Sequence, residues 1–235
     1  MKPASILLLD FDHTLYPSTL GTLPAVDARI NLYMQEFLGF TPQGADEARV
    51  KLWDKYGTTL KGLEELHGVD RGHYCDYIHA IEEIHLPPPD PALHDWLARV
   101  PHPAYIFTNA RLDWAVRGLK AMGLEDMLPE GMAAAQPAPG RFPRRLRGIF
   151  DIDFMDWEGK PNRAAYAKVD AYVRERHGAD ARVWFADDRM DNLESGRAQG
   201  WSTIWIHPHT AGPVRGDEFD RVVPTLLKLD PETLA

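Results

Sequence analysis

The sequence has almost no cysteine and no long hydrophobic run. Cys75 is the single cysteine among 235 residues, which excludes an internal disulfide framework and any cysteine-rich zinc site and indicates a reducing compartment. The first apolar run, residues 6–9, is too short to cross a membrane, and Asp10 and Asp12 follow it at once, so it is not a signal-peptide core either. We therefore expect a soluble, cytoplasmic protein.

Basic residues are also fewer than acidic residues. The chain has 26 Lys and Arg residues against 35 Asp and Glu residues, for a formal net charge of -9. This balance argues against partnership with a nucleic acid polymer or an anionic membrane, but a local site can still bind a small phosphorylated ligand. Hydrophobic residues at 44% and charged residues at 26% are ordinary for a globular protein and exclude global disorder or a coiled coil.

Short apolar runs alternate with helix-like segments along much of the chain. Four runs are nearly continuous, as expected for strands buried on both faces of a parallel sheet; they are residues 6–9, 104–107, 183–186 and 203–206. Segments with apolar residues at helical spacing separate the later runs; they are residues 112–122, 162–177 and 193–199. The alternation predicts an α/β fold with a doubly wound parallel sheet.

Residues 18–86 interrupt this alternation. They read as mostly helical, over 24–40, 44–56 and 71–84, and end in a proline-rich connector at 86–91 that cannot be helix interior. We therefore expect a core made of residues 1–17 and 87–235, with a small helical cap domain, residues 18–86, inserted after the first strand.

A second irregular stretch covers residues 128–147. It contains several Pro and Gly residues, followed by Arg141, Arg144, Arg145 and Arg147. Such stretches are usually solvated surface loops, which is the interpretation we favour. The alternative is a basic flap near an anionic ligand.

Polar residues follow three of the apolar runs directly: residues 10–14, then Thr108 and Asn109, then Asp187 and Asp188. Ligands of open parallel sheets bind beyond the carboxyl ends of the strands, so these groups should converge on one edge. Two carboxylates as close as Asp10 and Asp12 repel unless a cation compensates, and Mg²⁺ is commonly held by such groups. A single acid at a strand end is more often a cap, but two acidic pairs after separate strands favour a metal site.

These residues resemble the four motifs of the haloacid dehalogenase (HAD) superfamily. The segment 10–15 resembles the first motif, Thr108 the second, Lys160 the third, and Asp187-Asp188 the fourth. The resemblance spans residues 6–206 and implies a Rossmann-like HAD core. Within the superfamily, the segments 12–17, 56–62, 107–110, 148–152, 160–161 and 187–192 are similar to the pyrimidine 5′-nucleotidase subgroup, which carries a helical cap in the same place. Residues 128–147 depart from that subgroup's pattern.

The resemblance implies hydrolysis of a phosphate monoester through an aspartyl-phosphate. Asp10 would be the nucleophile, and Asp12 would protonate the leaving oxygen and later deprotonate the attacking water. Thr108, the main-chain amide of Asn109 and Lys160 would stabilise the phosphoryl oxygens. Mg²⁺ would be bound by Asp10, the main-chain carbonyl of Asp12, Asp187 and Asp188. A halide needs no acid to leave, so the acid at position 12 favours a phosphatase over a dehalogenase.

Substrate choice is assigned to the cap on the same resemblance. Tyr56 could stack on a base and Thr59 could bond its edge, while His13 could approach the leaving group. A helix end with a glycine stop explains Tyr56-Gly57 equally well. The expected substrate is a pyrimidine nucleoside monophosphate such as UMP or CMP. The alternatives are another small phosphate ester, such as phosphoglycolate or a sugar phosphate, or a catalytically silent binding protein. We expect a monomer or a homodimer.

Overall fold

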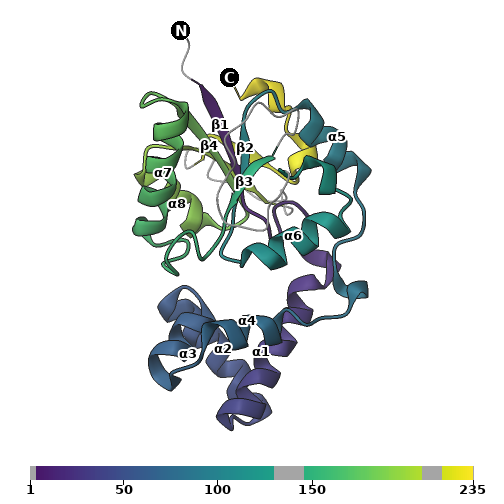
Figure 1. Cartoon of the computed structure of the whole chain (residues 1–235), viewed down its shortest axis with the longest axis vertical. Coiled ribbons are helices and arrows are strands. Elements are labelled where there is room, and N and C mark those ends of the chain that lie inside the picture. The colour runs from purple at the N-terminus through teal and green to yellow at the C-terminus, as the bar shows by residue number, and fades with distance from the viewer. Residues whose placement is uncertain (1–3, 130–145, 208–218, 235) are drawn as a thin grey trace. The chain divides into compact units, whose positions relative to one another are not determined.

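The computed structural model describes residues 4–129, 146–207 and 219–234. The chain divides into two compact units (Figure 1): one comprises Met1–Pro17 and Pro88–Ala235, and the other Ser18–Pro87. Arg141, Arg144 and Arg145, from the irregular arginine-containing stretch, lie outside the described residues. No helix within the described ranges is both long and apolar enough to span a membrane.

Within the described residues, the larger unit is built on a six-stranded parallel sheet. Its strands are β1 (Ser5–Leu9), β2 (Ala104–Phe107), β3 (Leu146–Phe150), β4 (Arg182–Asp187), β5 (Ser202–Ile206) and β6 (Arg221–Val223). Their order is β3-β2-β1-β4-β5-β6, so β1 lies inside the sheet, with Leu9 opposite Ile106 on one side and Ala186 on the other. The chain leaves β1 at a point where the strand order reverses, which is where ligands bind in such sheets.

Helices cover both faces of this sheet. In Figure 1, α5 (Pro91–Arg99) and α6 (Leu112–Ala121) lie on one side, and α7 (Arg163–His177) and α8 (Met190–Ala198) lie on the other. The core under α7 and α8 consists of fully buried apolar side chains, including Ile6, Leu8, Phe107, Val169, Phe185 and Leu193. Each such side chain stabilises the fold by about 1.5–3 kcal/mol relative to exposure. The α/β doubly wound architecture is therefore confirmed.

Local sequence signals explain where the helices of the sheet unit begin. Asp90 caps α5 by accepting a hydrogen bond from the Leu93 amide at 3.0 Å, and Pro91 occupies the first turn. Asn162 caps α7 by accepting from the Ala164 amide at 3.0 Å. The proline-rich connector therefore ends directly in a helix, which the sequence reading missed.

The smaller unit is a cap of four helices, three of which begin at a polar capping residue and three of which end at a glycine. Its helices are α1 (Thr22–Leu38), α2 (Pro42–Tyr56), α3 (Thr59–His67) and α4 (Arg71–Ile78). Thr41, Thr58 and Asp70 cap the last three of them, and Gly39, Gly57 and Gly68 end the first three at φ values of 72°, 81° and 65°. Its core includes Tyr33, Met34, Leu63 and Tyr74, all buried.

The structure corrects several element boundaries. Residues 59–67 form a helix that the sequence reading left out, and α4 ends at Ile78 rather than 84. Leu146 and Arg147 begin β3 and do not belong to the irregular stretch that the sequence predicts over residues 128–147. β6 was also missed. Short 3₁₀ turns complete the described residues; they are Ser18–Leu20, Glu83–His85, Glu125–Met127, Leu226–Lys228 and Pro231–Thr233.

Candidate active site

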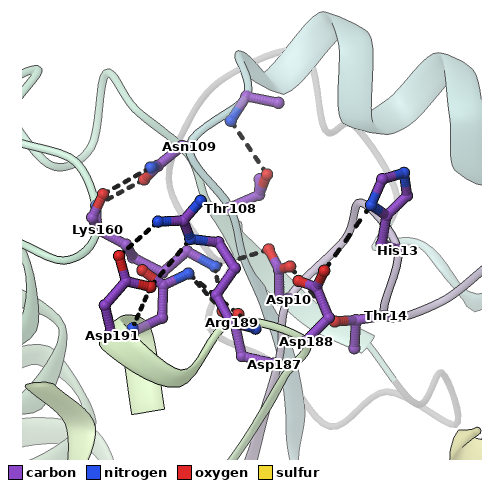
Figure 2. Close-up of polar contacts among 12 residues, drawn as sticks. Asp10, His13, Thr14, Thr108, Asn109, Lys160, Asp187, Asp188, Arg189 and Asp191 are labelled. Carbon is purple, nitrogen blue, oxygen red and sulfur yellow. Dashed lines mark hydrogen bonds and ion pairs between the residues drawn. The ribbon is translucent and has the colours of Figure 1, made fainter. Parts of the chain in front are cut away.

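Three acids from the ends of β1 and β4 lie together at the carboxyl edge of the sheet (Figure 2). The amide of Asp10 donates to the Ala186 carbonyl at 2.9 Å, which sets Asp10 beside Asp187. One carboxylate oxygen from each of Asp10, Asp187 and Asp188 lies within 4.8 Å of the other two. Asp10 is 7% exposed and Asp187 is fully buried. Residues 177 positions apart are thus brought together by strand register alone, since β1 pairs with β4 along its whole length.

Lys160 is the buried cation between two of these acids. Its Nζ donates to Asp10 Oδ1 at 2.6 Å and to Asp187 Oδ2 at 2.8 Å, and the residue is only 3% exposed. The ammonium also lies 5.1 Å and 5.4 Å from the ring centres of Phe107 and Phe185, which close off its sides. A lysine buried to this extent is kept charged by its carboxylate partners. The structure therefore places Lys160 against the proposed nucleophile.

Asn109 binds the main chain of Lys160 through its side chain. Its Nδ2 donates to the Lys160 carbonyl at 2.8 Å, and its Oδ1 accepts from the Lys160 amide at 2.6 Å. Gly159 makes room for this contact, because a Cβ there would lie 3.0 Å from Asn109 Oδ1. The sequence reading used only the main-chain amide of Asn109; the side-chain contact fixes the segment that carries Lys160.

Thr108 ends up beside this contact and is almost completely buried, at 1% exposed. Its Oγ1 accepts a hydrogen bond from the Ala110 amide at 3.0 Å. Its own amide donates to the Phe150 carbonyl of β3 at 3.0 Å. The hydroxyl is therefore held at the carboxyl end of β2, the position expected from the sequence.

The turn after β1 brings each acid of the first motif next to a hydroxyl four residues on. The Leu15 amide donates to the Phe11 carbonyl at 3.1 Å, closing a helix-like turn. As a result Thr14 Oγ1 lies 3.3 Å from Asp10 Oδ2, and the Tyr16 hydroxyl donates to Asp12 Oδ1. The sequence reading assigned no role to either hydroxyl. The i, i+4 spacing could have indicated both, had the turn been recognised.

His13 and Asp188 face each other at the open side of the site. His13 adopts a left-handed conformation with φ of 61°, and its Nδ1 lies 3.8 Å from Asp188 Oδ2 (Figure 2). Burial lowers the pKa of His13, which favours the neutral ring near neutral pH. The main-chain carbonyl of Asp188 accepts from Trp205 Nε1 at 3.0 Å, so the Asp188 main chain is anchored while its carboxylate stays partly exposed.

Asn192, in the first turn of α8, orients Asp187. Its Nδ2 lies 3.0 Å from both carboxylate oxygens of Asp187, and the Arg189 amide donates to Asp187 Oδ1 at 2.8 Å. The start of α8 accounts for the Arg189 donor, because main-chain amides at a helix start lack partners within the helix. Asn192 was not among the expected site residues, although its place in the turn after the acidic pair is a usable signal.

The two specificity candidates of the cap lie at the junction of α2 and α3. Tyr56 is the last residue of α2, and Gly57 ends that helix in a left-handed conformation, as the alternative interpretation expected. The Tyr56 ring packs on Gly62, where an added Cβ would lie 2.8 Å from Tyr56 Cδ2. Thr59 is buried, and its hydroxyl donates to the Arg49 carbonyl at 3.4 Å. Their roles toward substrate stay predictions.

The site carries more negative charge than its lysine can offset. Burial raises the pKa of Asp10, Asp12, Asp187 and Asp188 to about 6 in each case, although Lys160 lowers all four. Oxygen donors clustered at this density suit a hard divalent cation such as Mg²⁺. The donor set therefore fits the expected metal, with Asp10, Asp187 and Asp188 as the side-chain ligands.

We expect Mg²⁺ to stabilise the protein more strongly as the pH rises. The raised pKa values mean that the folded site holds protons up to about pH 6, whereas the unfolded chain loses them near 3.8. The contribution of these groups to stability is therefore fully present below 3.8 and is lost as the pH rises through about 6. Mg²⁺ requires the ionised carboxylates and replaces the lost protons. The measurement is the unfolding midpoint in urea, with Mg²⁺ and with a chelator, from about pH 5 to about pH 8.

Two variants act as controls for this measurement. Asp188→Asn should lose most of the stabilisation by Mg²⁺, because a ligand is removed. Asp95→Asn should keep it, since the Asp95 side chain is 84% exposed on α5 and is not part of the acidic cluster. A Mg²⁺ effect that is independent of pH, or that survives Asp188→Asn, would contradict a metal site at these acids.

Known structures resemble the chain over almost its whole length. No family model matches the sequence. The 2-haloacid dehalogenase of Pseudomonas syringae pv. Tomato DC3000 has 17% identity, 98% coverage of each chain and a TM-score of 0.55. The L-2-haloacid dehalogenase of Xanthobacter autotrophicus has 16% identity, 98% coverage of each chain and a TM-score of 0.54. The chain has the haloacid dehalogenase fold. The HAD-hydrolase YfnB of Bacillus subtilis, solved bound to magnesium, matches at 16% identity, 96% coverage of each chain and a TM-score of 0.53.

The HAD fold confirms the broad resemblance seen in the sequence. At 16–17% identity, these neighbours show the architecture of the chain but not its activity. The nucleotidase subgroup stays a prediction. The chemistry of this HAD-fold chain depends on its own side chains.

Proposed function

We propose that this HAD-fold protein is a Mg²⁺-dependent phosphate monoester hydrolase that works through an aspartyl-phosphate on Asp10. One observation carries the proposal. The Asp10 carboxylate is held by Lys160 at 2.6 Å, and a second carboxyl, Asp12, stands two residues further along the same turn with its own hydrogen-bond donor, Tyr16. The proposed nucleophile and the proposed acid–base group are thus two different carboxyls, and each has its own hydrogen-bond donor.

In the first step Asp10 attacks phosphorus, and the bond from phosphorus to the leaving oxygen breaks with its electron pair on that oxygen. Asp12 donates a proton to the leaving oxygen. In the second step water attacks the phosphoryl group, Asp12 takes a proton from that water, and Asp10 is released as a carboxylate. When bound, Mg²⁺ offsets the repulsion between the carboxylate and the phosphate dianion.

Lys160 and the end of β2 complete the site in this proposal. Lys160 orients Asp10 and adds positive charge where the phosphoryl oxygens gather. The Thr108 hydroxyl and the Asn109 main-chain amide bind those oxygens. The Asn109 side chain serves a different purpose, because it is bonded to the main chain of Lys160 at 2.6 Å and 2.8 Å.

Haloacid dehalogenation is the second candidate, favoured by the fold similarity to two haloacid dehalogenases. It also needs an aspartate nucleophile. A halide leaves as a stable anion, so a dehalogenase has no use for an acid at Asp12. The supported position of Asp12 therefore favours a phosphate ester, whose alkoxide leaving group must be protonated.

We further propose a pyrimidine nucleoside 5′-monophosphate, UMP or CMP, as the substrate, a small phosphorylated molecule in keeping with the expected partner. The support is the sequence similarity around residues 12–17 and 56–62. Tyr56 is the candidate for contacting the base. Thr59 is a weaker candidate than its sequence position indicated, because its hydroxyl is bonded to Arg49 within the cap. Phosphoglycolate or a sugar phosphate is the alternative substrate.

A substrate panel tests the proposal directly. The wild-type protein with Mg²⁺ should release phosphate from 4-nitrophenyl phosphate and, at higher kcat/KM than from sugar phosphates or phosphoglycolate, from UMP and CMP. Chelation should abolish the release. Asp12→Asn should lower kcat/KM for UMP by about 10²- to 10⁴-fold, the usual contribution of general acid catalysis.

The alternatives give different results in the same panel. Chloride release from 2-chloropropionate without phosphate release would identify a dehalogenase. Phosphate release with a flat substrate profile would reject the nucleotide proposal and keep the phosphatase. Inactivity toward both classes would support a silent binding protein.

A further inference from the structure

The Tyr16 hydroxyl is a buried donor aimed at the proposed acid–base group. It donates to Asp12 Oδ1, and Tyr16 is 4% exposed. The Trp114 side chain from α6 gives Asp12 a second hydrogen bond. Asp12 itself is only partly buried. Oδ1 of this carboxyl is therefore occupied by a protein donor, the Tyr16 hydroxyl.

Core packing holds the Tyr16 ring in this position. The ring meets Phe11 edge to face, with 5.6 Å between centres, and Phe11 is 1% exposed. Phe11 in turn rests on Gly118 of α6, where a Cβ would lie 2.4 Å from the Phe11 ring. Rigid contacts thus run from α6 through Phe11 to Tyr16, and the hydroxyl cannot swing away without disturbing the core.

The two oxygens of the Asp12 carboxyl consequently differ in what they can do. Oδ1 accepts from Tyr16 whether or not the carboxyl is protonated, because the phenol points its hydrogen there. A proton on Asp12 is therefore placed on Oδ2. We propose that Tyr16 is a positioning residue that reserves Oδ1 as an acceptor and directs Oδ2, with its proton, toward the leaving oxygen.

This assignment rests on the proposed function, in which Asp12 is the general acid. The proton moves from Asp12 Oδ2 to the leaving oxygen as the phosphorus–oxygen bond breaks and the bond to Asp10 forms. During hydrolysis of the aspartyl-phosphate, Oδ2 takes a proton from the attacking water, so the carboxyl returns to its starting state. Tyr16 keeps its own proton in both steps.

A leaving-group series separates this role from a purely structural one. Tyr16→Phe keeps the ring and removes the hydroxyl. A misplaced acid matters when the leaving group is a poor one, as in ethyl phosphate, and hardly matters for 4-nitrophenyl phosphate, whose phenolate departs without a proton. We expect kcat/KM to fall about 10- to 100-fold for ethyl phosphate and less than about threefold for 4-nitrophenyl phosphate. The comparison uses kcat/KM because this ratio reports only substrate binding and the transfer of the phosphoryl group to Asp10, and not the later hydrolysis of the aspartyl-phosphate.

Tyr105→Phe is the matched control. Tyr105 is 2% exposed, and its hydroxyl lies 2.8 Å from His177 Nε2, so the substitution also removes one hydrogen bond of a buried tyrosine. It should leave the ratio of kcat/KM between the two substrates unchanged. An equal loss on both substrates in Tyr16→Phe, or no loss on ethyl phosphate, would overturn the assignment.

Two further measurements keep the test decisive. Asp12→Asn should show a leaving-group-dependent loss at least as large as that of Tyr16→Phe. If only Asp12→Asn shows it, the Tyr16 role is wrong and the proposed function stands; if the wild type hydrolyses no phosphate ester, both fall.

Should Tyr16→Phe fail to fold, 3,5-difluorotyrosine at position 16 keeps the ring and the hydrogen bond but changes the acidity of the hydroxyl. The substrate ratio should then change by more than about twofold, and an unchanged ratio would overturn the assignment.

Discussion

Asp10→Asn is expected to lower kcat for phosphate ester hydrolysis by at least about 10⁴-fold, because an amide cannot form the aspartyl-phosphate. The fold should survive. Lys160 keeps Asp187 as a partner at 2.8 Å, and the lost group is one whose ionised form is disfavoured by burial, as its raised pKa indicates. The measurements are steady-state kinetics with Mg²⁺ and the unfolding midpoint in urea.

The intermediate itself can be captured in the same experiment. Acid quenching of the wild-type reaction should leave phosphate on the peptide that contains Asp10, detectable by mass spectrometry, and Asp10→Asn should leave none. The exposed Asp95→Asn variant should behave as the wild type in both kinetics and labelling. Phosphate found on another residue, or undiminished hydrolysis by Asp10→Asn, would reject Asp10 as the nucleophile.

Lys160→Met is expected to cost about 3–5 kcal/mol of unfolding free energy in the metal-free protein, because it leaves buried carboxylates without their cation. Methionine keeps an apolar stem between the rings of Phe107 and Phe185. Lys160 lowers the pKa of both Asp10 and Asp187, so these pKa values should rise further in the variant. The deficit should therefore grow as the pH rises through about 6 and shrink toward about pH 4, where the carboxyls are protonated.

Urea unfolding across that pH range, with a chelator present, measures this effect. Lys168→Met is the matched control, since Lys168 forms an equally short ion pair with Asp156, 2.6 Å, but at the surface. Removing such an exposed pair should cost less than about 1 kcal/mol at every pH. A Lys160→Met deficit that is as small, or that does not vary with pH, would show that the buried cation does not offset the acidic cluster.

Strands were predictable from the sequence where burial on both faces left a continuous apolar run. The run at 104–107 coincides with β2, and the run at 6–9 differs from β1 by one residue. β3 was missed because its sequence, Leu-Arg-Gly-Ile-Phe, breaks the run with a charge and a glycine. β6 is three residues long and is the last strand of the sheet in the described part of the chain, so one of its sides has no neighbouring strand there and the apolar signal is weak.

The position of an acid directly after a strand did not show whether it belongs to the candidate site or only caps a helix or turn. Asp151 follows β3 as Asp10 follows β1, and it is fully buried. Its carboxylate accepts from the amides of Leu112 and Phe154 at 3.0 Å and 2.9 Å, so it anchors the start of α6 and the turn after β3. The two roles are separated by the distant partner of each acid, which is the Lys160 ammonium for Asp10 and the Leu112 amide for Asp151.

The sequence by itself determined the α/β class, the helical insertion after the first strand, and the set of acids and the lysine that lie in the candidate site. The class, the insertion and the acids follow from local patterns, namely apolar runs, helical spacing and polar residues at strand ends, whereas the lysine was assigned through the resemblance to the HAD superfamily. Tertiary structure alone decided that Lys160 bridges Asp10 and Asp187 and that the Asn109 side chain holds the Lys160 main chain. These contacts join segments far apart in the chain and depend on strand register to an accuracy of tenths of an ångström, which no residue pattern encodes.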